Sequence, residues 1–197
     1  MVKNTMQKNI KKNIFNFTII YGSTRKNRVG IRFVYYLANQ IKLKGHKAII
    51  VDPLIAKLPM LNQRFVEYKK SKVPENIKKV QKALNRSSAF IVVSAEYNHM
   101  PPPALINIFN YYYAEFNRKP SCVCTYSSGD FAGIRVQSPL RAMLAQLGCP
   151  PIKFGMFQPK VSNFFNKEGA PSNQKDAEAR FNVFFDELLW YTKKLNS

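Results

Sequence analysis

Short apolar runs alternate with longer amphipathic segments along most of this chain. Five runs have the length of buried strands: residues 15–20, 47–51, 89–94, 121–125 and 152–155. Five segments carry apolar residues at helical spacing: residues 31–43, 74–86, 103–116, 134–147 and 173–195. Strands that alternate with helices form a parallel sheet covered on both faces, with right-handed crossovers. We therefore predict an α/β fold with a three-layer, doubly wound, five-stranded parallel sheet.

Length and composition predict a single globular domain. The chain has 197 residues, of which 46% are hydrophobic, and this is enough to bury a substantial core. We place that domain at residues 14–197, behind a flexible basic leader at 1–13 that lacks the pattern of a signal peptide. No apolar run approaches a membrane span, and three cysteines give no disulfide framework. We expect a cytoplasmic protein without membrane contact.

The formal net charge of +20 invites a nucleic-acid interpretation. The lysines are scattered over exposed positions of helical segments, however, and no known nucleic-acid-binding motif occurs. Compositional drift explains the charge most simply. Attraction of small anions and binding of nucleic acid remain as alternatives. We expect no nucleic-acid partner.

The loop at residues 22–30, Gly-Ser-Thr-Arg-Lys-Asn-Arg-Val-Gly, joins the first strand to the first helix. In doubly wound sheets ligands bind beyond the carboxyl ends of the strands, and free N–H groups at a helix start favour an anion. Ser23, Arg25 and Arg28 add a hydroxyl and two guanidinium groups, which suit a phosphate monoester. The loop is neither a P-loop nor a G-x-G-x-x-G motif, and an ordinary strand–helix connection would look similar.

Two further loops follow the third and fourth strands. Residues 94–103 hold Tyr97 and Asn98 before three prolines that stiffen the backbone, and they offer an aromatic face and amide groups to a planar heterocycle. Residues 126–133 contain two glycines, among them Gly129, which allow close approach to a flat ligand. Simple packing of the tyrosine and an ordinary glycine turn are the alternatives. Together, the three loops fit a mononucleotide.

These motifs, in this order, resemble the NADPH-dependent FMN reductase family of flavodoxin-like quinone and azo-dye reductases. The resemblance covers roughly residues 14–150. It is carried by four motifs: Gly22-Ser-x-Arg, Glu96-Tyr-Asn before proline and an apolar helix, Lys119-Pro120, and Ser-x-Gly-x-x-x-Gly leading to Leu140-Arg141. The family usually has proline before Glu-Tyr-Asn, where this chain has Ala95, and a Lys-Asn pair where this chain has Ile106-Asn107.

The resemblance implies FMN as the cofactor and NADPH or NADH as the co-substrate. Ser23, Arg25 and Arg28 would hold the FMN phosphate. The isoalloxazine ring would be bordered by two groups of residues: Glu96, Tyr97 and Asn98, and Ser127, Ser128 and Gly129. No catalytic side chain and no metal ligand are implied, because the flavin supplies the hydride chemistry.

The implied function is an FMN-dependent NAD(P)H oxidoreductase. It would pass hydride from a nicotinamide through FMN to a quinone, azo or similar small-molecule acceptor by a ping-pong mechanism. One alternative is a flavodoxin-type electron carrier without nicotinamide turnover, although such carriers are typically acidic. The other is a basic nucleic-acid-binding protein.

The segment at residues 103–116 is apolar almost all round, and one sheet face cannot bury such a circumference. We therefore predict a subunit interface there. The resemblance implies a homodimer, or a homotetramer, formed through the helices at 103–116 and 134–147.

Overall fold

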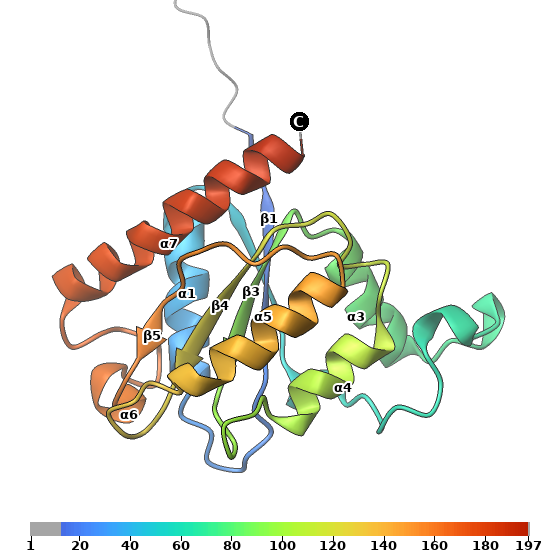
Figure 1. The fold of residues 1–197 in the computed structure, drawn as a ribbon, viewed down its shortest axis with the longest axis horizontal. Coiled ribbons are helices and arrows are strands. Elements are labelled where there is room, and N and C mark those ends of the chain that lie inside the picture. The colour runs from blue at the N-terminus through green and yellow to red at the C-terminus, as the bar shows by residue number, and fades with distance from the viewer. Residues whose placement is uncertain (1–12, 197) are drawn as a thin grey trace, which may run out of the picture.

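The computed structural model describes residues 13–196, so the predicted leader at 1–13 lies outside the described residues except for Asn13. Its five strands are β1 (Asn16–Tyr21), β2 (Lys47–Val51), β3 (Ala89–Ser94), β4 (Ser121–Tyr126) and β5 (Phe157–Gln158). They form one parallel sheet in the order β2-β1-β3-β4-β5. Helices cover both faces, as Figure 1 shows. The predicted doubly wound α/β fold is confirmed.

The described residues form seven α-helices, of which the last two follow β5: α1 (Ile31–Leu43), α2 (Pro53–Ala56), α3 (Glu75–Asn85), α4 (Pro103–Tyr111), α5 (Gln137–Gln146), α6 (Val161–Phe164) and α7 (Gln174–Leu195). Short 3-10 turns lie at Phe65–Glu67, Lys70–Lys72 and Ile134–Val136. Helices α1 and α7 pack on one face of the sheet and α3, α4 and α5 on the other (Figure 1). None of these helices is long and apolar enough to cross a membrane.

Alternation along the strands builds two separate cores. Phe17, Ile19 and Tyr21 of β1 face α1 and α7, whereas Ile20 faces the helices on the other side. Because side chains of a strand point alternately to the two faces, a strand buried on both sides is mostly apolar. This explains why β1 and β3 are largely apolar, and the buried hydroxyl of Thr18 in β1 is hydrogen-bonded to that of Ser87.

The last strand is not where the sequence predicted it. We expected residues 152–155, but β5 is Phe157–Gln158. Ile152 still donates its N–H to the Ser121 carbonyl at 2.8 Å. Gly155 then lies so close to β4 that a Cβ atom would be 2.0 Å from the Val123 carbonyl oxygen. Regular pairing therefore starts only beyond this glycine.

Helix α4 ends at Tyr111 and not at residue 116, because Tyr112 takes an extended conformation with φ −125° and ψ 141°. The chain then folds back, so that Tyr112 and Phe116 are buried in the core beneath α3, and the Tyr112 hydroxyl donates to the Ile77 carbonyl at 2.9 Å. Of the large aromatic side chains here, Tyr113 remains exposed. The reason given for an interface is therefore wrong: one subunit buries most of this apolar surface itself.

Candidate functional site

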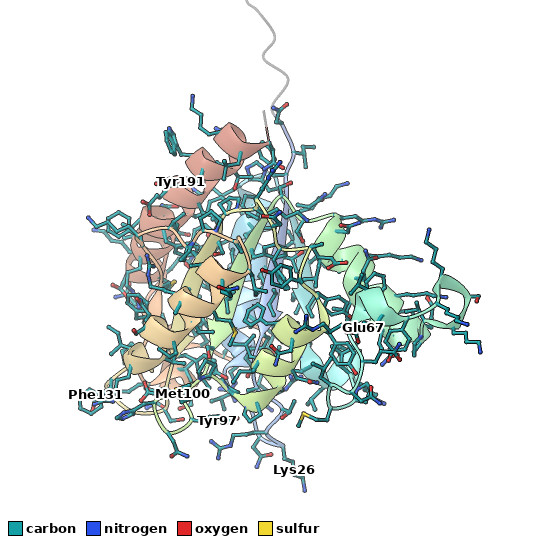
Figure 2. All side chains as sticks on the ribbon, turned by 45° about the vertical axis from the view of Figure 1, so that its right-hand side comes forward. Lys26, Glu67, Tyr97, Met100, Phe131 and Tyr191 are labelled. Carbon is teal, nitrogen blue, oxygen red and sulfur yellow. The ribbon has the colours of Figure 1, made fainter. Side chains whose placement is uncertain are left out.

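Three loops meet beyond the carboxyl ends of β1, β3 and β4. They are the β1–α1 loop (residues 22–30), the β3–α4 loop (95–102) and the β4–α5 loop (127–136). Figure 2 shows Lys26, Tyr97, Met100 and Phe131, which come from all three loops, at the same lower end of the molecule. The expected convergence of these loops is present.

The β1–α1 loop offers unused hydrogen-bond donors to the solvent. Within residues 13–196, the backbone N–H groups of Thr24, Lys26 and Asn27 make no hydrogen bond. The side chains of Thr24, Arg25 and Lys26 are exposed around them. Ser23 is buried, and its Oγ accepts a long hydrogen bond of 3.4 Å from the Arg25 N–H. Such a set of N–H groups, hydroxyls and cations fits a phosphate monoester.

Arg28 is bound within the protein. Its guanidinium makes a bidentate ion pair with the Asp52 carboxylate, donates to the Ser23 carbonyl at 3.0 Å, and lies 5.2 Å from the centroid of the Tyr21 ring. The hydrogen bonds that Arg28 donates to the Asp52 carboxylate raise the pKa of Arg28 above its ordinary value. Arg28 therefore stabilises the shape of the β1–α1 loop through its hydrogen bond to Ser23.

Asp52 is the residue that sequence reasoning missed. It is 4% exposed, follows β2, and caps α2 by accepting the Leu54 N–H at 3.0 Å. The signal was present in the sequence, because Asp-Pro after a strand is typical of a capped helix start. Its partner Arg28 could not be read from that pattern.

The β3–α4 loop holds Tyr97 at the start of a tight turn. Tyr97 and Met100 exchange two backbone hydrogen bonds of 3.0 Å each, and the residues between them, Asn98 and His99, have φ angles of 51° and 65°. Two positive φ angles are characteristic of a type I′ turn, which favours Asn. The Tyr97 hydroxyl lies 3.1 Å from Ser23 Oγ, so it joins the β3–α4 loop to the β1–α1 loop.

A pair of tyrosines lies beneath these two loops. The hydroxyls of Tyr21 and Tyr126 are 3.0 Å apart, and burial raises the pKa of both. Tyr126 packs over the start of α1, where a Cβ atom on Gly30 would come within 2.0 Å of its ring. Gly30, the last residue of the β1–α1 loop, is therefore required for this contact.

Hydrogen bonds hold the β4–α5 loop to the segments on both of its sides. Ser127 donates its hydroxyl to the Gly129 carbonyl at 2.8 Å and its N–H to the Gln158 carbonyl at 3.1 Å. The Lys160 N–H donates to the Gly129 carbonyl at 3.0 Å. On the other side, Glu96 accepts from the backbone N–H of Arg135 at 3.1 Å. Glu96 thus ties the β3–α4 loop to the β4–α5 loop.

The predicted site residues fall into two groups. Direct contacts join Ser23 with Arg25, Arg28 and Tyr97, and Ser127 with Gly129. Asn98 and Ser128 lie exposed on the same loops. Among residues 13–196, no group of three or more His, Cys, Asp or Glu side chains could hold a metal ion.

Solved structures with a similar fold include two oxidoreductases and a flavodoxin. The flavoenzyme NAD(P)H:(acceptor) oxidoreductase FerB of Paracoccus denitrificans has a TM-score of 0.75 at 18% identity, over 92% of this chain and 98% of that one. The NAD(P)H:quinone oxidoreductase of Methanothermobacter marburgensis has a TM-score of 0.56 at 11% identity, over 93% and 98%. A mutant flavodoxin of Pseudomonas aeruginosa has 0.55 at 13% identity, over 88% and 98%. These similarities show the fold.

The family follows from the sequence match. No curated protein matches the chain. The pattern of one protein family, however, matches residues 15–158, which include all five strands and all three loops of the site. The chain therefore belongs to the NADPH-dependent FMN reductase family.

Proposed function

We propose that this protein is an FMN-dependent NAD(P)H oxidoreductase that reduces quinones, azo compounds or similar small acceptors. Bound FMN would supply the chemistry by accepting hydride from a nicotinamide and passing reducing equivalents to the acceptor. Since both substrates would use one cleft in turn, the proposed kinetics are ping-pong. The protein itself would bind and orient the cofactor and supply its electrostatic environment.

The observation that carries this proposal is the donor set of the β1–α1 loop. Within residues 13–196, three backbone N–H groups of this loop make no hydrogen bond, and the side chains of Thr24, Arg25 and Lys26 are exposed in the same segment, which precedes α1. The nearby carboxylate of Asp52 is already neutralised by Arg28. This environment favours a dianionic phosphate, so we assign Ser23 and Arg25 to the FMN phosphate and Arg28 to positioning their loop.

The other two loops suit the ring of the cofactor. Tyr97 offers a partly exposed aromatic side chain whose hydroxyl contacts Ser23. Ser128 and Gly129 are exposed on a loop whose backbone is hydrogen-bonded to Gln158 and Lys160. We assign Tyr97, Asn98, Ser128 and the 127–129 backbone to the border of the isoalloxazine. Backbone donors there would stabilise negative charge that develops on reduction. Glu96 would act by positioning, because Arg135 occupies its carboxylate.

We propose that the protein works in the cytoplasm as one domain over residues 14–197, and as a homodimer or homotetramer. Three buried, unpaired cysteines are consistent with a reducing compartment. Burial of most apolar side chains of the 103–116 segment weakens the argument for assembly there. Its remaining support is exposed Tyr113 beside exposed Val66, at 54% and 81%.

An absorbance spectrum of the purified protein, followed by anaerobic addition of NADPH and then a quinone, tests the proposed function. We expect a yellow protein that NADPH bleaches and the quinone restores. A yellow protein that NADPH does not reduce would favour the electron carrier. A colourless protein that binds no added FMN would contradict the proposal, and its retention on DNA in a salt-dependent way would favour the nucleic-acid alternative.

A further inference from the structure

The β4–α5 loop displays a phenylalanine to the solvent beside the candidate site. Phe131 is 67% exposed. The following residues, Ala132 and Gly133, have φ angles of 53° and 67°, and the Ile134 N–H donates to the Phe131 carbonyl at 3.1 Å. This is a second turn with two left-handed residues, and its alanine occupies a conformation that is unfavourable for residues with a Cβ atom.

Buried contacts maintain this unfavourable turn. The Thr125 hydroxyl donates to the Ala132 carbonyl at 2.7 Å inside the protein. A Cβ atom on Gly133 would lie 2.8 Å from the Tyr126 carbonyl oxygen, so the chain passes directly against β4. Strained backbone that the surrounding structure holds in place is concentrated at functional sites. Here its consequence is a fixed, outward-facing Phe131.

A cation is fixed on the same ring. The Arg135 guanidinium lies 4.7 Å from the centroid of Phe131 and 3.5 Å from Glu96 Oε1, while its backbone N–H also bonds to Glu96. Its side chain is still 42% exposed. Because Arg carries five N–H donors, those that Glu96 does not use remain available to a ligand anion.

The surroundings favour an anionic, flat ligand. Met100 and Ile134 are exposed apolar side chains on the two adjoining loops, and Figure 2 shows Met100 and Phe131 at the same end of the molecule. The other carboxylate of this loop, Asp130, pairs with Lys160 at 2.8 Å. Neither acidic side chain of the two loops is therefore left without a cation.

We propose that Phe131 and Arg135 form a recognition element for a substrate that combines a planar ring with an anionic group. This inference rests on the proposed function and names the substrate chemistry of the same site. Phe131 would stack on the ring, and Arg135 would bind the anion. Two substrates could supply this chemistry: the adenosine 2′-phosphate end of NADPH, or an aromatic acceptor with a sulfonate or carboxylate.

Steady-state kinetics of the purified full-length protein with three substrate pairings distinguish these sources. NADPH and NADH are compared at a fixed neutral naphthoquinone, and the neutral naphthoquinone is compared with its sulfonated derivative at fixed NADH. Each is measured for wild type, Arg135→Met and Phe131→Ala. Lys153→Met is the matched control, because Lys153 lies 4.9 Å from the ring of Phe154, an exposed cation–aromatic pair on another part of the surface.

We expect Arg135→Met to lower kcat/KM by about 10-fold or more for one anionic substrate, because a hydrogen bond to a charged group contributes about 1.5–3 kcal/mol. The uncharged counterpart should change by less than about 2-fold, since the lost contact is to the anion alone. A selective loss with NADPH assigns the pair to the nucleotide, and a selective loss with the sulfonated quinone assigns it to the acceptor. Phe131→Ala should raise KM for the same substrate.

Two results would overturn the inference. If Arg135→Met changes all three pairings equally, its role is structural; if it changes none, the pair binds no substrate anion. Thermal unfolding of each variant verifies that it is folded, and Arg135→Lys, which keeps the charge, should recover part of the selectivity. Wild-type protein that oxidises neither nucleotide contradicts the proposed function, and this inference with it, whereas normal turnover with uniform effects contradicts only this inference.

Discussion

Arg28 and Asp52 show how a residue predicted to bind a ligand can act by holding other residues in place. Both belong to loops at the carboxyl edge of the sheet, and their side chains are 14% and 4% exposed. A carboxylate and a guanidinium at such depth are compatible with folding only as a pair. The pair sets the position of Ser23, whose carbonyl accepts from Arg28 and whose hydroxyl contacts Tyr97.

Replacing Asp52 by Asn is expected to lower the free energy of unfolding by about 3 kcal/mol, because it leaves the Arg28 charge largely buried without its carboxylate. Urea denaturation followed by circular dichroism measures this change. The matched control is Asp130→Asn, which breaks the exposed pair with Lys160 and should cost less than about 1 kcal/mol. Equal effects of the two substitutions would contradict the structural role given to the Arg28–Asp52 pair.

The elements show what local sequence patterns can and cannot predict. Helix α1 has the predicted bounds, residues 31–43, because its apolar stripe is regular and Gly30 precedes it. Strand β5 was misplaced because the apolar residues at 152–155 resemble a strand, while the close approach of Gly155 to Val123 depends on a distant segment. Helix α4 was drawn too long because the aromatic residues after Tyr111 continue its apolar pattern although the backbone turns extended.

The location of the candidate site was predictable from the sequence, but the side-chain contacts between its loops were not. Loops after parallel strands meet at one edge by topology alone, so Ser23 and Tyr97 could be placed at the same edge from the sequence. Contacts between distant loops, such as Arg28 with Asp52 and Glu96 with Arg135, depend on side-chain geometry across the fold. The two turns with left-handed residues could not be predicted from the sequence either, because Asn98-His99 and Ala132-Gly133 have no residue types in common.

At the scale of the whole molecule, two buried cores cover the faces of the sheet, and the loops of the candidate site lie at its carboxyl edge. The formal net charge is +20, and the carboxylates of Asp52, Glu96 and Asp130 near this edge are each paired with a cation. Among residues 13–196, Arg25 and Lys26 make no ion pair with an acidic side chain. The potential at this edge should attract anionic substrates.

Stability is expected to fall steeply in alkali. Burial raises the pKa of Tyr21, Tyr126 and Cys122, and raises that of Cys149 to about 12. Unfolded thiols and phenols ionise near pH of about 8.5 and 10, so above these values the unfolded chain has released protons that the folded protein keeps. Each group then removes about 1.4 kcal/mol per pH unit. Burial also raises the pKa of Tyr36, Tyr111 and Tyr112. The lowered pKa of Lys119 acts in the opposite direction, as one group against these seven thiols and phenols.

Thermal unfolding at constant ionic strength measures this dependence. The Tm should be nearly constant between about pH 7 and 8, below the unfolded pKa values, and should fall progressively above about pH 9. A Tm that stays level up to about pH 10.5 would show that these thiols and phenols ionise equally easily in the folded protein.

The affinities of FMN and riboflavin test whether the loop after β1 binds the phosphate of FMN, as we propose. Riboflavin has the same ring and no phosphate, so isothermal titration of both into the apoprotein isolates the phosphate contribution. We predict that wild type binds FMN about 100-fold or more tightly than riboflavin, and that Arg25→Ala lowers this ratio by about 10-fold or more while Arg86→Ala, at the opposite end of the sheet, does not. Equal affinities for the two flavins in the wild-type protein would contradict the account.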